Sequence, residues 1–269
     1  AMEQQGTNSN IVLQILDQYG GFFTELGEYE MADVVYEKAY LVSTEALGAQ
    51  DPRTTLRLQT LANNDAELQR YELAEQRLQD AQATLVTAVG AEALPTINVL
   101  EDLAQLYQRQ GKLRPALEPL EQSYALRTKV LGPEETQTLE TKERLAELYR
   151  QLGRPDEAEP MFLEVIATAE QLLGIADPLV IDAKSHLAQL YENTNNFVAS
   201  LRYYQEVYEI DQQILGDAHP NTAGDLNNLA GIYRRLGQLQ QSEATYRQAL
   251  QAMSAALGEG APQTISIMN

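Results

Sequence analysis

The clearest hydrophobic pattern in the chain is the stretch of residues 226–250, LNNLAGIYRRLGQLQQSEATYRQAL. Apolar residues recur there at the three- and four-residue spacing of an amphipathic helix, first before Gly237 and again after it. The pattern predicts two helices joined by a tight turn at that glycine. One such pair cannot bury its apolar face alone, so neighbouring pairs of the same kind are expected.

The same unit recurs along the chain with a fixed period. Six glycines stand 42 residues apart without an insertion or deletion, each after an aliphatic residue: Gly48, Gly90, Gly132, Gly174, Gly216 and Gly258. An aliphatic residue followed by glycine is typical of a helix that ends in a left-handed glycine, so these positions are predicted to end the second helices. The first helices are predicted to begin soon afterwards, where a capping residue precedes a proline: Asp51-Pro52, Asp177-Pro178 and His219-Pro220.

Small and bulky residues also keep this period, which indicates interlocking packing. The small column, where two helices are expected to approach closely, holds Gly20, Ala62, Ala104, Ala146, Ala188 and Ala230. The bulky column holds Tyr36, Leu78, Leu120, Phe162, Tyr204 and Tyr246. The turn inside each pair carries glycine in four copies, with Asn195 and Gln69 in the other two.

Small, aromatic and glycine columns in a helix-turn-helix unit resemble the tetratricopeptide repeat. The 42-residue period, with LNNLAGIYRRLG and the inter-repeat segment LGDAHPNT, is similar to the kinesin-light-chain type of that repeat. The resemblance covers roughly residues 11–258. It implies an all-α fold, a right-handed superhelical solenoid of about six helix pairs.

The repeats suggest a domain organisation. Residues 11–258 are predicted to form a single solenoid of six repeats, at about 11–52, 53–94, 95–136, 137–178, 179–220 and 221–258. Residues 1–10 are interpreted as a tag remnant or leader, and residues 259–269 as the truncated start of a further repeat or a tail. The helix at about 238–257 keeps its apolar stripe without a covering element, so self-association through it is a further expectation.

The resemblance implies that the first helices line a concave groove and recognise partners through a few recurring positions. Transferring those positions copy by copy predicts a peptide-binding groove that includes Asn98, Glu101, Asp102, Gln105, Glu140, Glu143, Arg144, Glu147, Arg150, Asp182, His186, Gln189, Asn227, Asn228, Arg234 and Arg235. Acidic residues gather in the middle copies, and the last copy is basic. An acidic groove favours a basic or neutral peptide. The alternative is that these residues are solvated helix faces with local charge pairs.

Composition narrows the classes of partner. The chain has 39 acidic and 19 basic residues, a net charge of -20, which opposes binding to nucleic acid and to anionic membrane surfaces. No apolar run is long enough to span a bilayer, and the start, AMEQQGTNSN, lacks the features of a signal peptide. A cytoplasmic location is expected, with export left open. The absence of cysteine excludes disulfides, zinc-thiolate sites and thiol catalysis.

The sequence offers no catalytic constellation. It contains no nucleotide-binding loop, no nucleophile elbow and no metal-ligand cluster, and its two histidines lack the spacing of a metal or catalytic pair. We therefore expect no enzyme activity, no cofactor and no metal. His186 is a groove residue that could respond to pH, and His219 is assigned to the loop that starts a first helix.

The second repeat breaks two apolar columns. Asn64 and Asp65 stand where the other copies have apolar or aromatic residues. A buried aspartate must be hydrogen-bonded or hydrated. The two interpretations are a locally loosened or rotated helix and a polar notch or hinge in the superhelix. If the helix is merely loosened, Asn64→Leu with Asp65→Tyr should stabilise the protein.

The sequence thus predicts a noncatalytic scaffold that binds proteins or peptides in the concave groove. The alternative is a structural spacer or self-association module of a larger multidomain signalling protein.

Overall fold

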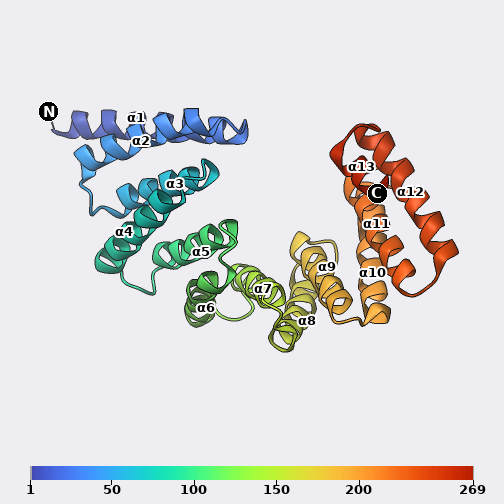
Figure 1. Cartoon of the computed structure of the whole chain (residues 1–269). Coiled ribbons are helices and arrows are strands. Elements are labelled where there is room, and N and C mark those ends of the chain that lie inside the picture. The colour runs from blue at the N-terminus through green and yellow to red at the C-terminus, as the bar shows by residue number, and fades with distance from the viewer. Residues whose placement is uncertain (1, 269) are drawn as a thin grey trace. The chain divides into compact units, whose positions relative to one another are not determined.

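The computed structural model describes residues 2–268, with the side chains of residues 10–267. Within that part of the chain every regular element is an α-helix, and the helices follow one another in pairs (Figure 1). The chain divides into two compact units, Ala1–Pro133 and Glu134–Asn269, each with its own run of helix pairs. The expectation of a single solenoid over residues 11–258 therefore stays a prediction.

The first unit contains three helix pairs. Its helices are α1 (Met2–Glu25), α2 (Tyr29–Leu47), α3 (Pro52–Glu67), α4 (Tyr71–Val89), α5 (Leu94–Arg109) and α6 (Leu113–Val130). Each helix packs against its neighbours in the chain, and α3 also contacts α5. Residues 2–10 belong to α1, so the segment assigned to a leader is helical and continuous with the first repeat.

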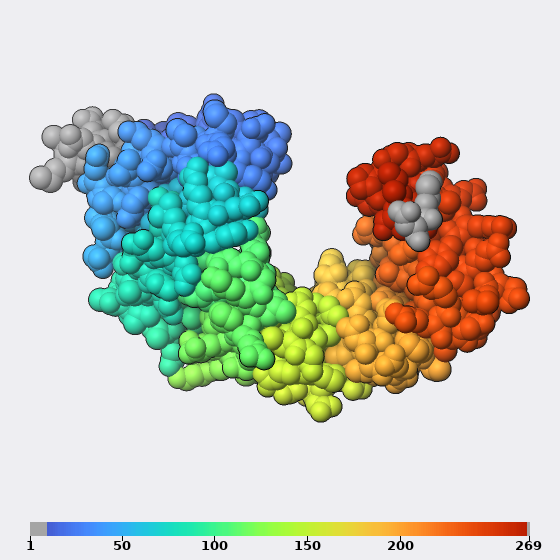
Figure 2. Space-filling model, in the orientation of Figure 1, coloured from blue at the N-terminus to red at the C-terminus, as the bar shows by residue number. Residues whose placement is uncertain are grey.

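The second unit contains three pairs and a short additional helix. Its helices are α7 (Thr136–Gln151), α8 (Pro155–Leu172), α9 (Pro178–Asn193), α10 (Phe197–Leu215), α11 (Pro220–Arg235), α12 (Leu239–Leu257) and α13 (Pro262–Met268). The first helices α7 and α9 contact each other, as α3 and α5 do in the first unit. Within each unit each repeat packs on the next one in the chain. The steady change of colour along each unit in the space-filling view shows this order (Figure 2).

The predicted helix starts and turns are confirmed. Asp51 and Asp177 each accept a hydrogen bond from the backbone two residues later, at 2.9 Å, and His219 Nδ1 accepts one from Asn221 at 3.2 Å. These side chains cap α3, α9 and α11. Gln69 and Asn195 take positive φ angles of 59° and 61°, so they adopt the turn that glycine makes in the other repeats.

Four periodic glycines, at positions 48, 90, 216 and 258, directly follow the second helices as predicted, and Gly132 and Gly174 lie one residue further along. Their expected left-handed helical conformation is wrong. Gly216 has φ 84° and ψ 166°, and Gly48 has φ 92° and ψ 155°. This ψ is extended and lies far from the left-handed helical value, in a region that is essentially restricted to glycine. The glycine therefore stops the helix and sends the chain straight into the next loop.

The small and bulky columns form the core. Ala62, Ala146 and Ala188 are completely buried, and Phe162 is the largest fully buried side chain among the described residues. Gly20 occupies the tightest position of its column, because a Cβ there would lie 2.2 Å from a ring carbon of Tyr36. The small column thus permits the close approach that the sequence predicted.

The last helix pair is not left bare, contrary to the expectation from the sequence. The short helix α13 packs against α12. Its Thr264 hydroxyl donates to the carbonyl of Gly258 at 2.8 Å, and Thr96, four repeats earlier, makes the same bond to Gly90. Residues 262–268 therefore begin as the first helices of the other repeats do.

The polar residues of the second repeat lie in an unbroken helix. Asp65 is fully buried on α3, where it forms ion pairs with Arg77 and, at 3.6 Å, with Arg70. The neighbouring Asn64 donates to the backbone carbonyl of Tyr29 at 3.1 Å. The expected hydrogen bonding of the aspartate is confirmed, and neither a loosened helix nor a notch is needed to explain it. These residues tie α3 to α2 and α4.

Candidate functional site

The candidate site is the exposed side of the first helices, called here the first-helix face. In the second unit it is formed by the predicted groove residues of α7, α9 and α11. The apolar residues of these helices point the other way, since Leu145, Leu187 and Leu229 are buried against the second helices. The fold therefore leaves polar residues such as Glu140, Asp182 and Asn228 at the surface of the first helices.

A short contact on this face joins α7 to α9. Nδ1 of His186 lies 2.5 Å from Oε1 of Glu143, whose residue is only 7% exposed. Burial lowers the pKa of His186, but the hydrogen bond and charge of Glu143, with the charge of Glu147, outweigh it and raise the pKa above its usual value. When it is protonated, the imidazole neutralises an acid that the sequence assigned to an open groove.

A second acid on α7 is also paired within the chain. Glu147 accepts two hydrogen bonds of 2.6 Å from Arg150 and one of 2.7 Å from Gln151. Burial raises the pKa of Glu147, but the bonds from Arg150 and the charge of His186 outweigh it, and its pKa lies below the usual range. A fork of this kind satisfies both carboxylate oxygens. Glu147 offers little free charge to a ligand.

The predicted residues of the first unit are similarly engaged. Asp102 accepts hydrogen bonds from Gln59 at 2.6 Å and Asn63 at 3.1 Å. Glu101 and Asn98 meet at Arg127, which lies 2.8 Å from each of them. Of the predicted residues here, only Gln105 is exposed with no contact among the described residues.

Most of the remaining predicted residues of the second unit are exposed, and several have no hydrogen bond or ion pair among the described residues. Glu140 and Asp182 are exposed on α7 and α9, and Asn228, Arg234 and Arg235 are exposed on α11. Within the part of the chain that the structure describes, no hydrogen bond or ion pair involves these five side chains. Arg144 is exposed but has a partner, and Gln189 and Asn227 are partly buried. The free charge on this face is thus acidic on α7 and α9 and basic on α11.

Sequence reasoning missed a pair of carboxyl groups between α10 and α11. Asp211, only 6% exposed, shares a hydrogen bond with Asp225. Burial, followed by the charge and hydrogen bond of Asp211, raises the pKa of Asp225 to about 7. Asp225 stands in a column that is not consistently apolar, since other copies hold Val99 and Ala183 but also Arg57 and Thr141. The sequence therefore gave no signal for this pair of the kind that it gave for Asp65.

The described residues contain no group of three or more histidine, aspartate or glutamate side chains that could hold a metal ion. Separately, none of the helices in the described part of the chain is long and apolar enough to cross a bilayer.

Stacked helix pairs with a buried apolar side and a polar first-helix face define an all-α repeat scaffold of the kind used in protein interactions. The sequence matches the family described as tetratricopeptide repeat in five overlapping windows, residues 54–129, 97–171, 137–213, 179–255 and 224–269. The chain belongs to the tetratricopeptide-repeat family. No curated protein sequence matches it significantly.

Solved structures with the same fold include kinesin-light-chain proteins. A kinesin light chain of nearly identical TPR-like repeats from Podospora anserina has a TM-score of 0.69 at 23% identity, over 77% of this chain and 98% of that one. BtubC (BKLC) from P. vanneervenii has a TM-score of 0.70 at 17% identity, over 96% and 93%. The STAND ATPase PH0952 from Pyrococcus horikoshii, which has a tetratricopeptide-repeat sensor, has a TM-score of 0.72 at 15% identity, over 96% of this chain and 39% of that one. At these identities the likeness concerns the fold.

Proposed function

We propose that the protein is a noncatalytic scaffold that binds a protein or peptide segment along its first-helix face. The observation that carries this proposal is the set of exposed, unpaired side chains on α11, Asn228, Arg234 and Arg235, in a family whose fold serves protein interaction. A chain with a net charge of -20 that keeps two neighbouring arginines free has cations available for a partner.

The charges on this face define the chemistry of the segment. Arg234 and Arg235 would pair with an acidic group, whereas Glu140 and Asp182 would attract a basic one. Glu143 and Glu147 contribute less than the sequence suggested, because His186 and Arg150 already neutralise them. The ligand is therefore an extended or helical segment with basic residues facing α7 and α9 and an acidic residue facing α11.

A peptide-display selection tests this proposal. A random library is selected on the intact protein, and the recovered peptides are measured against a variant carrying Arg234→Glu and Arg235→Glu. We expect affinity to fall at least about tenfold, because two cation contacts are lost and replaced by repulsion. The matched control is Arg202→Glu on the second helix α10, an exposed arginine outside the first-helix face. If the peptides bound the Arg234/Arg235 variant as tightly as they bind the native protein, the first-helix face would be excluded as their binding site.

The second candidate function is a structural module that self-associates through α12. It is favoured by a groove of about 390 Å³ whose lining includes Leu239, Tyr246 and Leu250, with Leu239 61% exposed. A contiguous exposed apolar patch is typical of an interaction surface. Sedimentation velocity over a concentration series should then show association that Leu239→Glu abolishes and that Leu163→Glu, on exposed Leu163 of α8, leaves intact. A monomer at all concentrations would rule this function out.

The proposal includes a cytoplasmic location. Fractionation of the source cells, followed by detection of the chain with antibodies, would test it.

A further inference from the structure

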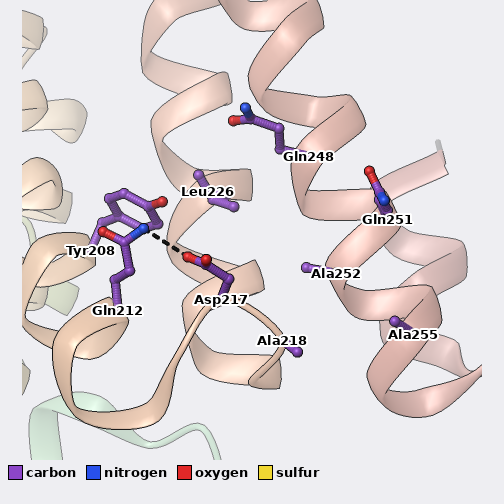
Figure 3. Close-up of a pocket in the computed structure, with 9 residues that line it drawn as sticks. All are labelled: Tyr208, Gln212, Asp217, Ala218, Leu226, Gln248, Gln251, Ala252 and Ala255. Atoms are coloured by element: carbon purple, nitrogen blue, oxygen red, sulfur yellow. Dashed lines mark hydrogen bonds between the residues drawn. The ribbon is translucent and has the colours of Figure 1, made fainter.

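A cleft of about 450 Å³ lies between the second helices α10 and α12 (Figure 3). Tyr208 and Gln212 of α10, with Asp217 of the following loop, form one wall. Gln248 and Gln251 extend from α12 on the opposite side. None of the residues that line this cleft was among the predicted groove residues, and none belongs to the first-helix face.

The same repeat positions form a cleft in the first unit. That cleft, of about 530 Å³, lies between α2 and α4. Seven of its lining residues stand 168 residues, four repeats, before lining residues of the α10–α12 cleft: Tyr40, Ala49, Gln50, Leu58, Asp80, Ala83 and Thr84. A cleft that recurs at the same position in separate units reflects the repeat architecture and is not a local packing defect.

One lining position differs in side-chain size between the two clefts and the equivalent place between α8 and α10. Ala252 and Thr84 occupy equivalent positions in the two clefts. Between α8 and α10 the corresponding residue is Ile210, which is only 8% exposed and fills that space. Lys184, at the position of Leu226, reaches Glu206 and Glu170 at 2.8 and 2.7 Å in the same region. Both clefts therefore have a small residue at this column, where the corresponding position between α8 and α10 has a large one.

The chemistry of the α10–α12 cleft suits a cation on an apolar stem. Asp217 is the only charged residue among the nine that line it. One of its carboxylate oxygens accepts a hydrogen bond of 2.7 Å from Gln212, and the other makes no bond among the described residues. Leu226, Ala252 and Ala255 supply apolar surface. A lysine side chain combines a four-carbon stem with an ammonium group that has three donors.

Two further features favour a positive charge here. Burial, followed by the charge of Asp217, raises the pKa of the Tyr208 hydroxyl, so the tyrosine stays neutral and its ring can contact a cation. In the first-unit cleft, Ala49 replaces the acid of the loop, and the lining Asp80 is accompanied by Arg77. The loop of the α10–α12 cleft thus carries an acid, Asp217, that the loop of the first-unit cleft lacks.

We propose that the cleft between α10 and α12 binds a lysine side chain of a partner protein. The ammonium group pairs with the free oxygen of Asp217 and donates to the side-chain oxygens of Gln248 and Gln251, and the stem lies over Leu226 and Ala252. This site is separate from the first-helix face, so it can be tested whether or not that face binds a peptide.

Nuclear magnetic resonance of the intact chain, labelled at alanine methyl groups, provides the test. The protein is titrated with N-acetyl-lysine methylamide and with its norleucine counterpart, which has a similar stem and no charge. We expect the lysine probe to shift the methyl signals of Ala252 and Ala255 with an affinity at least about tenfold higher than that of norleucine. The methyl of Ala83, in the first-unit cleft whose loop has Ala49 in place of the acid, is the internal control and should not move.

Variants separate the contributions of charge and space. Asp217→Asn keeps the shape of the exposed loop residue and should weaken lysine binding about tenfold. Ala252→Ile, which copies Ile210 of the preceding repeat, should abolish it, whereas Ala256→Ile on an exposed position of α12 should not. Equal binding of norleucine, unchanged binding by Asp217→Asn, or equal shifts at Ala83 would overturn the proposal. If the free diamine 1,5-diaminopentane bound more tightly than the capped lysine, the proposal that the cation belongs to a protein would be wrong.

Discussion

His186 Nδ1 and Glu143 Oε1 lie 2.5 Å apart, in residues separated by 43 positions in the sequence. The same 43-residue step joins Gln59 to Asp102 at 2.6 Å in the first unit. One repeat therefore contacts the next through the same two positions of the first helices in both units. The pair His186–Glu143 is the ionic version of this contact, so its strength depends on pH.

Replacement of His186 should reduce stability in a pH-dependent manner. The pKa of His186 is raised in the folded protein, so its contribution is complete below the unfolded pKa and is lost as the pH rises through the folded pKa. We expect His186→Gln to cost about 1–2 kcal/mol at pH 5.5 and much less at pH 8.5. Urea unfolding at the two pH values measures this difference. In a Glu143→Gln background the difference should largely disappear, and a cost independent of pH would contradict the ion pair.

The carboxyl pair Asp211–Asp225 should also make stability fall with rising pH, but through burial of a charge instead of loss of an ion pair. The pKa of Asp225 is raised to about 7, so the folded state binds more protons than the unfolded state between about pH 4 and pH 7, and stability falls as the pH rises through that window. Asp225→Asn should therefore stabilise the protein by about 1–2 kcal/mol at pH 8 and by little at pH 4. Thermal unfolding at both pH values tests this. Glu209→Gln, at an exposed position of α10, is the matched control and should show no such gain at pH 8.

Removal of Asp65 should strongly destabilise the first unit. Its carboxylate is fully buried and paired with Arg77 and Arg70, so Asp65→Ala leaves Arg77 without this partner. Loss of one member of a buried ion pair costs about 3–5 kcal/mol. The double change Asn64→Leu with Asp65→Tyr should also destabilise, in contrast to the sequence-based expectation for a loosened helix. Addition of Arg77→Met to Asp65→Leu should recover most of the loss in urea unfolding, and a failure to recover would assign the cost to packing.

Replacement of two glycines by alanine, one at the end of α10 and one inside α11, should change the stability in opposite directions. Gly216 has φ 84° and ψ 166°, which alanine adopts only with strain, so Gly216→Ala should cost about 1–3 kcal/mol. Gly224 lies inside α11, where a Cβ added to the residue would meet no atom within 4 Å, so Gly224→Ala should stabilise by about 0.5–1 kcal/mol. Thermal unfolding of both variants provides the measurement. Destabilisation by both would show that the α11 position lacks the space the structure gives it.

Much of the fold could be predicted from the sequence, because its determinants are periodic and local. The 42-residue spacing of glycines placed the helix ends, and the residues before prolines placed the caps at Asp51, Asp177 and His219. The turn positions of Gln69 and Asn195 followed from their register with glycine. Each of these features depends on one residue and its near neighbours, so a single sequence contains the necessary information.

The candidate site could be predicted only in part. The sequence located the first-helix residues, and Asn228, Arg234 and Arg235 on α11 are exposed and unpaired among the described residues, as a binding surface requires. It treated the acids of α7 as free, although Glu143 and Glu147 are paired with His186 and Arg150. It also gave no sign of the clefts, which are lined by Thr84 and Ala252 at equivalent repeat positions.

The sequence alone therefore determined the helix pairs, their period and the residues that face the core, because helix periodicity and capping act over a few residues. The tertiary structure decided which charges are neutralised, as between residues 143 and 186, and where space remains between second helices, as beside Ala252. These properties depend on side chains from different repeats that meet only after the helices have stacked, and on the volume each side chain then fills.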